Sequence, residues 1–193
     1  MASFDLALQY GCDGFEFDVR MTADGQPVIC HDPRTRGVAI ARAKGAHLRQ
    51  LPSLRGVLIR YQDTAFLDIE LKVAGVEKTI ANQLRKFPPA RGCVVSSFLP
   101  DVLRNLHEED ASIPLGLICE TRAQLALWSR LPVAYVIPHQ RLLRQSVIGE
   151  LQEAGKKVLV WTVNSRASMK KLAKWQVEGI VSDKTELLVQ TVR

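Results

Sequence analysis

The stretches Phe15-Glu16-Phe17-Asp18-Val19 and Leu67-Asp68-Ile69-Glu70-Leu71-Lys72 decide the fold. Both alternate apolar and charged residues with a period of two, which indicates strands with one apolar face and one charged face. The charges gather at the last positions of each strand, a pattern typical of the rim of an active site. We therefore predict that these strands bring carboxylates and a lysine to one mouth, where a divalent cation and a phosphate bind.

Strand-like and helix-like segments alternate along the rest of the chain, which predicts a parallel sheet with helical crossovers. The end of a helix at 3–10, stopped by Gly11, comes first. Strand-like runs follow at 15–20, 27–30, 65–72, 93–98, 114–119, 133–137, 157–163 and 179–182. Helical patterns lie at 76–87, 100–108, 122–131, 143–154, 165–175 and 185–192.

The turn Ala23-Asp24-Gly25 makes the run at 27–30 a hairpin partner of the strand before it, outside the barrel. Seven strand-and-helix units with a half-helix in front are what remains when an eight-stranded barrel loses its first strand. A doubly wound sheet is the competing architecture, but no Gly-x-Gly-x-x-Gly follows the first strand. We predict an α/β fold, a TIM (β/α)8 barrel missing its first strand and loop, with residues 1–193 as one domain.

Composition and charge narrow the range of possible functions. The net charge of +6 is spread along the chain and aromatic residues make up only 6%, so the sequence favours small anionic substrates over nucleic acid. No apolar stretch is long enough to predict a membrane span or a signal peptide. The four cysteines show no Cys-x-x-Cys spacing, which indicates free thiols and a cytoplasmic location.

Candidate metal ligands follow from the strand geometry. Glu16 and Asp18 lie two residues apart, so both side chains face the same way, about 7 Å apart, and can converge on one oxygen-seeking cation. Glu70 adds a third carboxylate from the next barrel strand, and Lys72 faces the same way as a positive charge for phosphate. A salt-bridged structural pair is the alternative interpretation of Glu16 and Asp18.

His31 follows a strand-like run and precedes Asp32-Pro33, so we expect it at a strand end. Histidine titrates near neutrality, which suits it to act as a general acid or base; a partly buried structural histidine is the alternative. His139, after Ile137-Pro138, is a second histidine expected at a strand end.

Phe98 and Trp161 fall near the ends of predicted strands. Each serves either core packing or the apolar wall of a substrate pocket. Asp183, after the last strand, lies either at the rim of that pocket or at the start of a helix as its N-cap.

Seven segments occur here in the order in which they occur in the glycerophosphodiester phosphodiesterase family, which the chain resembles over nearly its whole length. They are Gly11-Cys12-Asp13-Gly14-Phe15-Glu16-Phe17-Asp18-Val19, Thr22-Ala23-Asp24-Gly25-Gln26-Pro27-Val28-Ile29-Cys30-His31-Asp32, Leu51-Pro52-Ser53-Leu54, Ile69-Glu70-Leu71-Lys72, Ser96-Ser97-Phe98, Trp161-Thr162-Val163-Asn164 and Gly179-Ile180-Val181-Ser182-Asp183.

The resemblance implies a TIM barrel that hydrolyses glycerophosphodiesters to glycerol 3-phosphate and an alcohol, within lipid and glycerol metabolism. By position it implies that Glu16, Asp18 and Glu70 bind Mg²⁺ or Ca²⁺. It also implies that His31 is one of two acid–base histidines and that Lys72 lies near the phosphate. A glycerol hydroxyl as internal nucleophile is a further implication.

The chain departs from the family at its start, where members carry a His-Arg-Gly strand and a loop ending in Glu-Asn-Thr. Either Met1 is an internal methionine of a longer active protein, which we favour, or the chain is a short form with half its acid–base pair. Removing a strand leaves two unpaired edges, so we expect self-association and little diesterase activity. A catalytically silent barrel that binds a cation and phosphate-containing ligands is the alternative function. A phospholipase-D-like activity on lysolipids would need an apolar trough.

Overall fold

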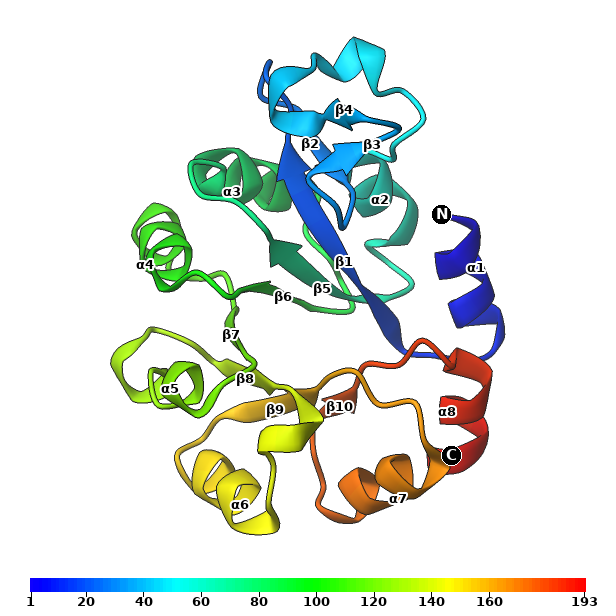
Figure 1. Cartoon of the computed structure of the whole chain (residues 1–193), viewed down its shortest axis with the longest axis vertical. Coiled ribbons are helices and arrows are strands. Elements are labelled where there is room, and N and C mark those ends of the chain that lie inside the picture. The colour runs from blue at the N-terminus through cyan, green and yellow to red at the C-terminus, as the bar shows by residue number, and fades with distance from the viewer.

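Seven parallel strands curl into the wall of an open barrel in the computed structural model, which describes residues 1–193 (Figure 1). They lie in the order β10, β9, β8, β7, β6, β5, β1, and β2 pairs with the end of β1 in antiparallel fashion. This order confirms the predicted barrel with one strand missing and the predicted hairpin. The strands are β1 (Gly14–Met21), β2 (Pro27–Ile29), β5 (Phe66–Leu71), β6 (Cys93–Ser97), β7 (Leu115–Cys119), β8 (Tyr135–Pro138), β9 (Lys157–Val160) and β10 (Gly179–Ile180).

Helices form the outer layer around the sheet (Figure 1). The predicted helix at 122–131 is wrong in its second half, because the chain turns after Leu125 into a short 3-10 segment at Trp128–Arg130. Leu131, which precedes a proline, is extended. The helix at 54–61 was not predicted, although Ser53 caps it by accepting a hydrogen bond from the Gly56 N–H. The helices are α1 (Ala2–Gln9), α2 (Leu54–Tyr61), α3 (Glu77–Lys86), α4 (Pro100–Glu109), α5 (Arg122–Leu125), α6 (Gln145–Glu153), α7 (Arg166–Lys174) and α8 (Thr185–Val192).

The barrel wall is open between β1 and β10. No strand joins them: β10 pairs only with β9, and β2 covers only Val19–Met21 of β1. Outside this opening α1 and α8 lie next to one another (Figure 1), and Arg193 donates a 2.6 Å hydrogen bond to Asp13 beside them. Both predicted unpaired edges are therefore present.

Helix α1 packs against β1 and α2 beside the opening. The Phe4 ring stacks on that of Phe15 at a centroid distance of 4.1 Å. The Tyr61 hydroxyl donates a 2.7 Å hydrogen bond to Asp5, which also pairs with Arg60 at 2.8 Å. These contacts join α1 to β1 and α2.

The core lies between the sheet and its helices because alternate strand residues face outward. On β5, Leu67, Ile69 and Leu71 are at most 1% exposed and belong to one cluster of 33 buried residues. Phe17 and Val19 of β1 join the same cluster, as predicted for the outward face. The residues between them face the barrel interior.

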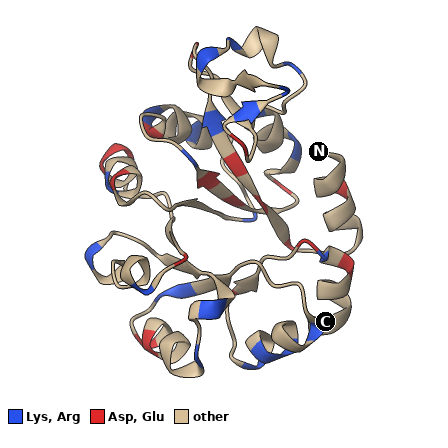
Figure 2. Ribbon diagram, viewed as in Figure 1, with Lys and Arg blue, Asp and Glu red and all other residues tan.

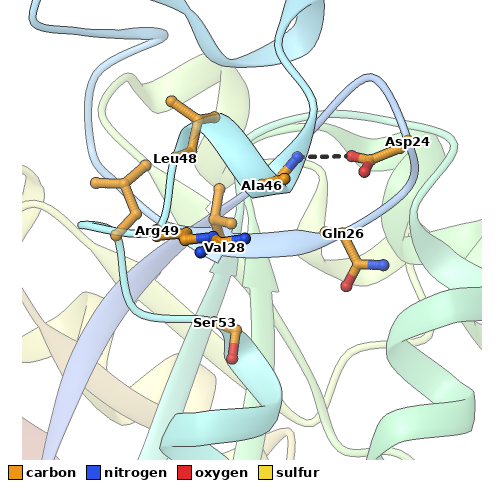
Figure 3. A pocket seen from close by; sticks show the side chains of 9 residues that line it. Asp24, Gln26, Val28, Ala46, Leu48, Arg49 and Ser53 are labelled. Carbon is orange, nitrogen blue, oxygen red and sulfur yellow. Dashed lines mark hydrogen bonds between the residues drawn. The ribbon is translucent and has the colours of Figure 1, made fainter.

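A segment between β2 and α2, here called the cap, lies beside the end of β1 that pairs with β2 (Figure 1). It contains β3 (Arg34–Thr35), β4 (Val38–Ala39) and two 3-10 turns, packed around Val28, Ile40, Ala43 and Leu48. Asp24 joins the hairpin turn to the cap by accepting a 2.9 Å hydrogen bond from the Gly45 N–H. Both residues line a shallow hollow of about 370 Å³ (Figure 3). None of the helices has the length and apolar composition needed to cross a bilayer.

Candidate active site

Three carboxylates converge at the mouth of the barrel. Glu16, Asp18 and Glu70 each offer one oxygen, and these oxygens lie within 4.8 Å of one another. The register explains this, since Asp18 of β1 is the direct partner of Glu70 of β5, and Glu16 lies two residues earlier on the same face. Figure 2 shows acidic positions in red on these two strands. All three carboxylates line one cleft. The spacing fits a single cation with oxygen ligands.

Lys72 lies directly after β5 and contacts two of these carboxylates. Its Nζ is 2.6 Å from Glu70 Oε1 and 3.2 Å from Asp18 Oδ1. Burial alone would lower the pKa of Lys72, but the ion pairs outweigh it and raise that pKa. The lysine therefore remains charged at the edge of the triad, where it can bind an anionic oxygen.

Glu16 shows that the site fits a cation. Its Oε1 is buried without a hydrogen-bond partner. Burial, together with the charges of three neighbouring carboxylates, raises the pKa of Glu16 to about 9. A buried oxygen under such repulsion is stabilised by a positive ion, so the donor set suits a divalent cation.

Asp68 is a fourth carboxylate for which the sequence analysis assigned no role. It pairs in register with Glu16, is 4% exposed, and accepts a 2.5 Å hydrogen bond from the Ser96 hydroxyl. Burial raises the pKa of Asp68 to about 7, although the Ser96 hydrogen bond acts in the opposite direction. Its position two residues before Glu70 was the signal that could have identified it.

His31 lines the same cleft from the segment that follows β2. Its side chain is 77% exposed, and Nδ1 lies 2.9 Å from Asp32 Oδ1. Arg20 holds the backbone there by donating two hydrogen bonds to the His31 carbonyl, at 3.0 and 2.7 Å. The structure thus places His31 at the rim and not in the core.

Aromatic side chains form another part of the cleft wall. Phe98 and Trp161 both line the cleft of about 510 Å³, with ring centroids 5.6 Å apart in an edge-to-face contact. Trp161 Nε1 donates a 2.8 Å hydrogen bond to the Ile137 carbonyl. His139 does not line the cleft; its ring packs edge-to-face on Trp161 at 5.1 Å.

Asp183 lies at the rim, because it lines the cleft and makes no side-chain cap of α8. Glu120, for which the sequence gave no signal, lines the same wall after β7. The seven residues predicted for the site, which are Glu16, Asp18, His31, Glu70, Lys72, Phe98 and Trp161, all line this one cleft.

Comparisons with known proteins agree on one family. The sequence model of the glycerophosphoryl diester phosphodiesterase family matches residues 1–91 and 56–187. YhdW of Bacillus subtilis is 30% identical over 98% of this chain and 90% of its own length. A glycerophosphodiester phosphodiesterase of Caldanaerobacter subterraneus is 25% identical over 100% of this chain and 91% of its own.

Solved structures give the same result. A phosphodiesterase of Oleispira antarctica, in complex with the product sn-glycerol-3-phosphate, superposes with a TM-score of 0.87 and 25% identity, over 99% of this chain and 89% of its own. A glycerophosphodiester phosphodiesterase of Thermotoga maritima gives a TM-score of 0.83 at 22% identity, over 97% and 88% of the two chains, which supports the fold.

Proposed function

The chain belongs to the glycerophosphoryl diester phosphodiesterase family, and on that premise we propose that it hydrolyses glycerophosphodiesters to glycerol 3-phosphate and an alcohol with a divalent cation. The convergence of Glu16, Asp18 and Glu70 within 4.8 Å carries this proposal. The Oleispira antarctica phosphodiesterase of the same fold, which was solved with sn-glycerol-3-phosphate, supports the substrate class.

Each residue of the cleft has a proposed role. Glu16, Asp18 and Glu70 would hold Mg²⁺ or Ca²⁺, which when bound polarises phosphoryl oxygens. Lys72 offsets the negative charge that develops on the phosphate. His31, exposed at the rim, moves a proton to or from the ester oxygen. Phe98 and Trp161 bind the organic part of the substrate and keep water from it.

A second candidate function is binding of a cation and a phosphate-containing ligand without turnover. His31 is the one histidine that lines the cleft, whereas the resemblance implies an acid–base pair. With a single proton-transfer group, the same triad and lysine would still bind both ligands.

Two further proposals concern the state of the protein. The unpaired edges of β1 and β10 suit pairing with another copy of the chain, so we expect self-association that light scattering would detect. Cys12, Cys30, Cys93 and Cys119 are free thiols, which suits the reducing cytoplasm.

Calorimetry followed by a turnover assay tests the function. Mg²⁺ and Ca²⁺ are titrated into the wild type, Glu70→Gln, and the control Glu108→Gln, which removes an exposed carboxylate on α4. We expect Glu70→Gln to weaken cation binding at least about tenfold and to reduce release of glycerol 3-phosphate from glycerophosphocholine at least about a hundredfold. Cation binding without turnover would favour the second candidate. Absence of cation binding in the wild type would refute both.

A further inference from the structure

Acidic residues are absent from most of the cap and from the helix that follows it. Basic residues occur along the whole chain, but residues 33–62 contain seven Lys and Arg and no Asp or Glu. The charge of this segment is therefore +7, which exceeds the net charge of +6 of the whole chain. Figure 2 shows Lys and Arg positions in blue on the cap. Such a concentration of one sign of charge attracts anionic partners.

The basic side chains of the cap are exposed and have no acidic partner. There are five of them, and none forms a salt bridge: Arg34, Arg36, Arg42, Lys44 and Arg49. Elsewhere, arginines such as Arg104 and Arg141 pair with carboxylates at 2.7 and 2.9 Å. The charge of the cap is thus not neutralised within the protein.

Two carboxylates border the cap, and both are engaged locally. Asp32 Oδ1 lies 2.9 Å from His31 Nδ1. Asp24 Oδ1 accepts hydrogen bonds from the Thr22 hydroxyl at 2.6 Å and from the Gly45 N–H at 2.9 Å. The Thr22 hydrogen bond is the main cause of the lowered pKa of Asp24, and the charge of Lys44 is a smaller one. Two carboxylates against five basic residues leave this region positive.

The tip of the cap hairpin combines a strained arginine with an exposed apolar side chain. β3 and β4 are joined by the two-residue turn Arg36–Gly37, whose φ angles are 48° and 80°. This left-handed backbone favours Gly, Asn or Asp, so an arginine here costs stability. Val38, directly after the turn, is 46% exposed and is the one large hydrophobic side chain exposed on the cap. A strained, charged residue beside an exposed apolar one indicates a contact surface.

The cap presents this surface on a folded unit. Val28, Ile40, Ala43 and Leu48 form a buried cluster of their own, at most 7% exposed. Residues 30–53 include no Phe, Tyr or Trp, so the cap has no ring on which nucleic-acid bases could stack. Exposed charge with an apolar tip and without aromatic rings fits lipid head groups better than single-stranded nucleic acid.

We propose that the cap docks the protein on an anionic lipid bilayer, with the hairpin tip at Arg36–Val38 against the head groups. Each Lys or Arg near an anionic bilayer tightens binding about fivefold, and Val38 adds an apolar contact at the interface. The cap comes directly after His31, which lines the cleft, so docking would hold the cleft close to the bilayer. This inference goes beyond the proposed hydrolysis and does not depend on it.

Binding to lipid vesicles tests the proposal. The wild type is sedimented with vesicles of phosphatidylcholine alone and with vesicles that also contain about a third phosphatidylserine, in about 0.1 M salt. We expect binding to the anionic vesicles to be at least about tenfold tighter than binding to the neutral ones. Equal binding to both kinds of vesicle, or no binding to either, would overturn the proposal.

A triple variant of the cap locates the binding surface. Arg36→Asn, Arg42→Gln and Lys44→Gln together remove three charges, and asparagine tolerates the left-handed backbone at position 36. This variant should bind anionic vesicles at least about tenfold more weakly than the wild type. Its Tm should not fall, which shows that the loss of binding is not a loss of folding.

A matched triple variant controls for the overall charge. Lys78→Gln, Arg130→Gln and Lys170→Gln also remove three exposed charges without a salt-bridge partner, all outside the cap. Vesicle binding should weaken less than about threefold in this variant, through the general field alone. Equal weakening in the two triple variants would refute a docking surface on the cap.

Duplex DNA and the variant Val38→Thr distinguish a lipid surface from another polyanion. Val38→Thr keeps the side-chain shape but replaces a methyl group with a hydroxyl, so it should weaken vesicle binding about twofold and leave DNA binding unchanged. Tighter binding of the wild type to DNA than to anionic vesicles would refute the assignment to lipid and favour nucleic acid. No substrate is present in these measurements, so their outcome is independent of diesterase activity.

Discussion

Replacing Glu16 with glutamine is expected to stabilise the protein when no divalent cation is present. Its Oε1 is buried without a hydrogen-bond partner, and burial with neighbouring carboxylates raises the pKa of Glu16 to about 9. A folded pKa above the unfolded one means that the folded state holds a proton that the unfolded state releases. Below the unfolded pKa, Glu16 therefore costs the wild type no free energy of unfolding. As pH rises from there toward the folded pKa, the free energy of unfolding falls.

The magnitude follows from the distance between the working pH and the unfolded pKa. At pH 7, about 2.5 units above the ordinary glutamate pKa of 4.5, holding the proton costs about 3 kcal/mol. Because pH 7 lies below the folded pKa, this cost does not depend on how far above 7 that pKa lies. Glutamine carries no charge and needs no proton, so it should recover up to about 3 kcal/mol, or roughly 6–12 °C in Tm for a chain of this length.

Thermal unfolding in a chelator measures this effect. Tm is compared for the wild type, Glu16→Gln and the control Glu108→Gln at about pH 5 and about pH 8. The gain from Glu16→Gln should be small at the lower pH and large at the higher one, and the control should be flat. Adding Mg²⁺ should raise the Tm of the wild type and leave Glu16→Gln nearly unchanged. A gain that is absent or independent of pH would refute the reasoning.

Three further predictions concern stability elsewhere. Gly14→Ala would place its Cβ against the Phe66 backbone carbonyl of β5 and should lower the free energy of unfolding by at least about 1 kcal/mol. Gly149→Ala, with open space around it in α6, should raise the free energy of unfolding by up to about 1 kcal/mol, and urea titration of both variants checks the contrast. The Tyr61 hydrogen bond lowers the pKa of Asp5, so Asp5→Asn should lower the free energy of unfolding at neutral pH. The difference in free energy of unfolding between Asp5→Asn and the wild type should vanish as pH falls below 3.8 and through the lowered pKa; an unchanged difference in acid would contradict this. Ser53→Ala removes the N-cap of α2 and should cost about 1 kcal/mol, while Ser53→Asp, read out in the same titration, should restore most of it.

Local pattern was enough to predict which way the strand residues face. The period of two in β1 and β5 placed Glu16, Asp18 and Glu70 on one side and Phe17 on the other, because successive side chains of a strand alternate by geometry. The parallel barrel, the hairpin and the missing strand followed from the order of elements, and the structure confirms them. The α2 helix was not predicted because its N-cap residue, Ser53, was not recognised as a helix start.

Contacts between distant strands depended on how the sheet curls, and no local pattern encodes that. The hydrogen bond from Ser96 to Asp68 joins residues 28 apart, and the indole of Trp161 is fixed by a carbonyl 24 residues away. Glu120 has no distinguishing neighbours in sequence, and the sequence left Asp183 as either a rim residue or an N-cap, yet both line the same cleft as the triad. Side-chain direction is set by each strand's own backbone, so the sequence determined the charged inner face and its candidate ligands. Which groups meet across the cleft is set by the register and curvature of the whole sheet, so only the tertiary structure decided which of the candidate side chains line one cleft.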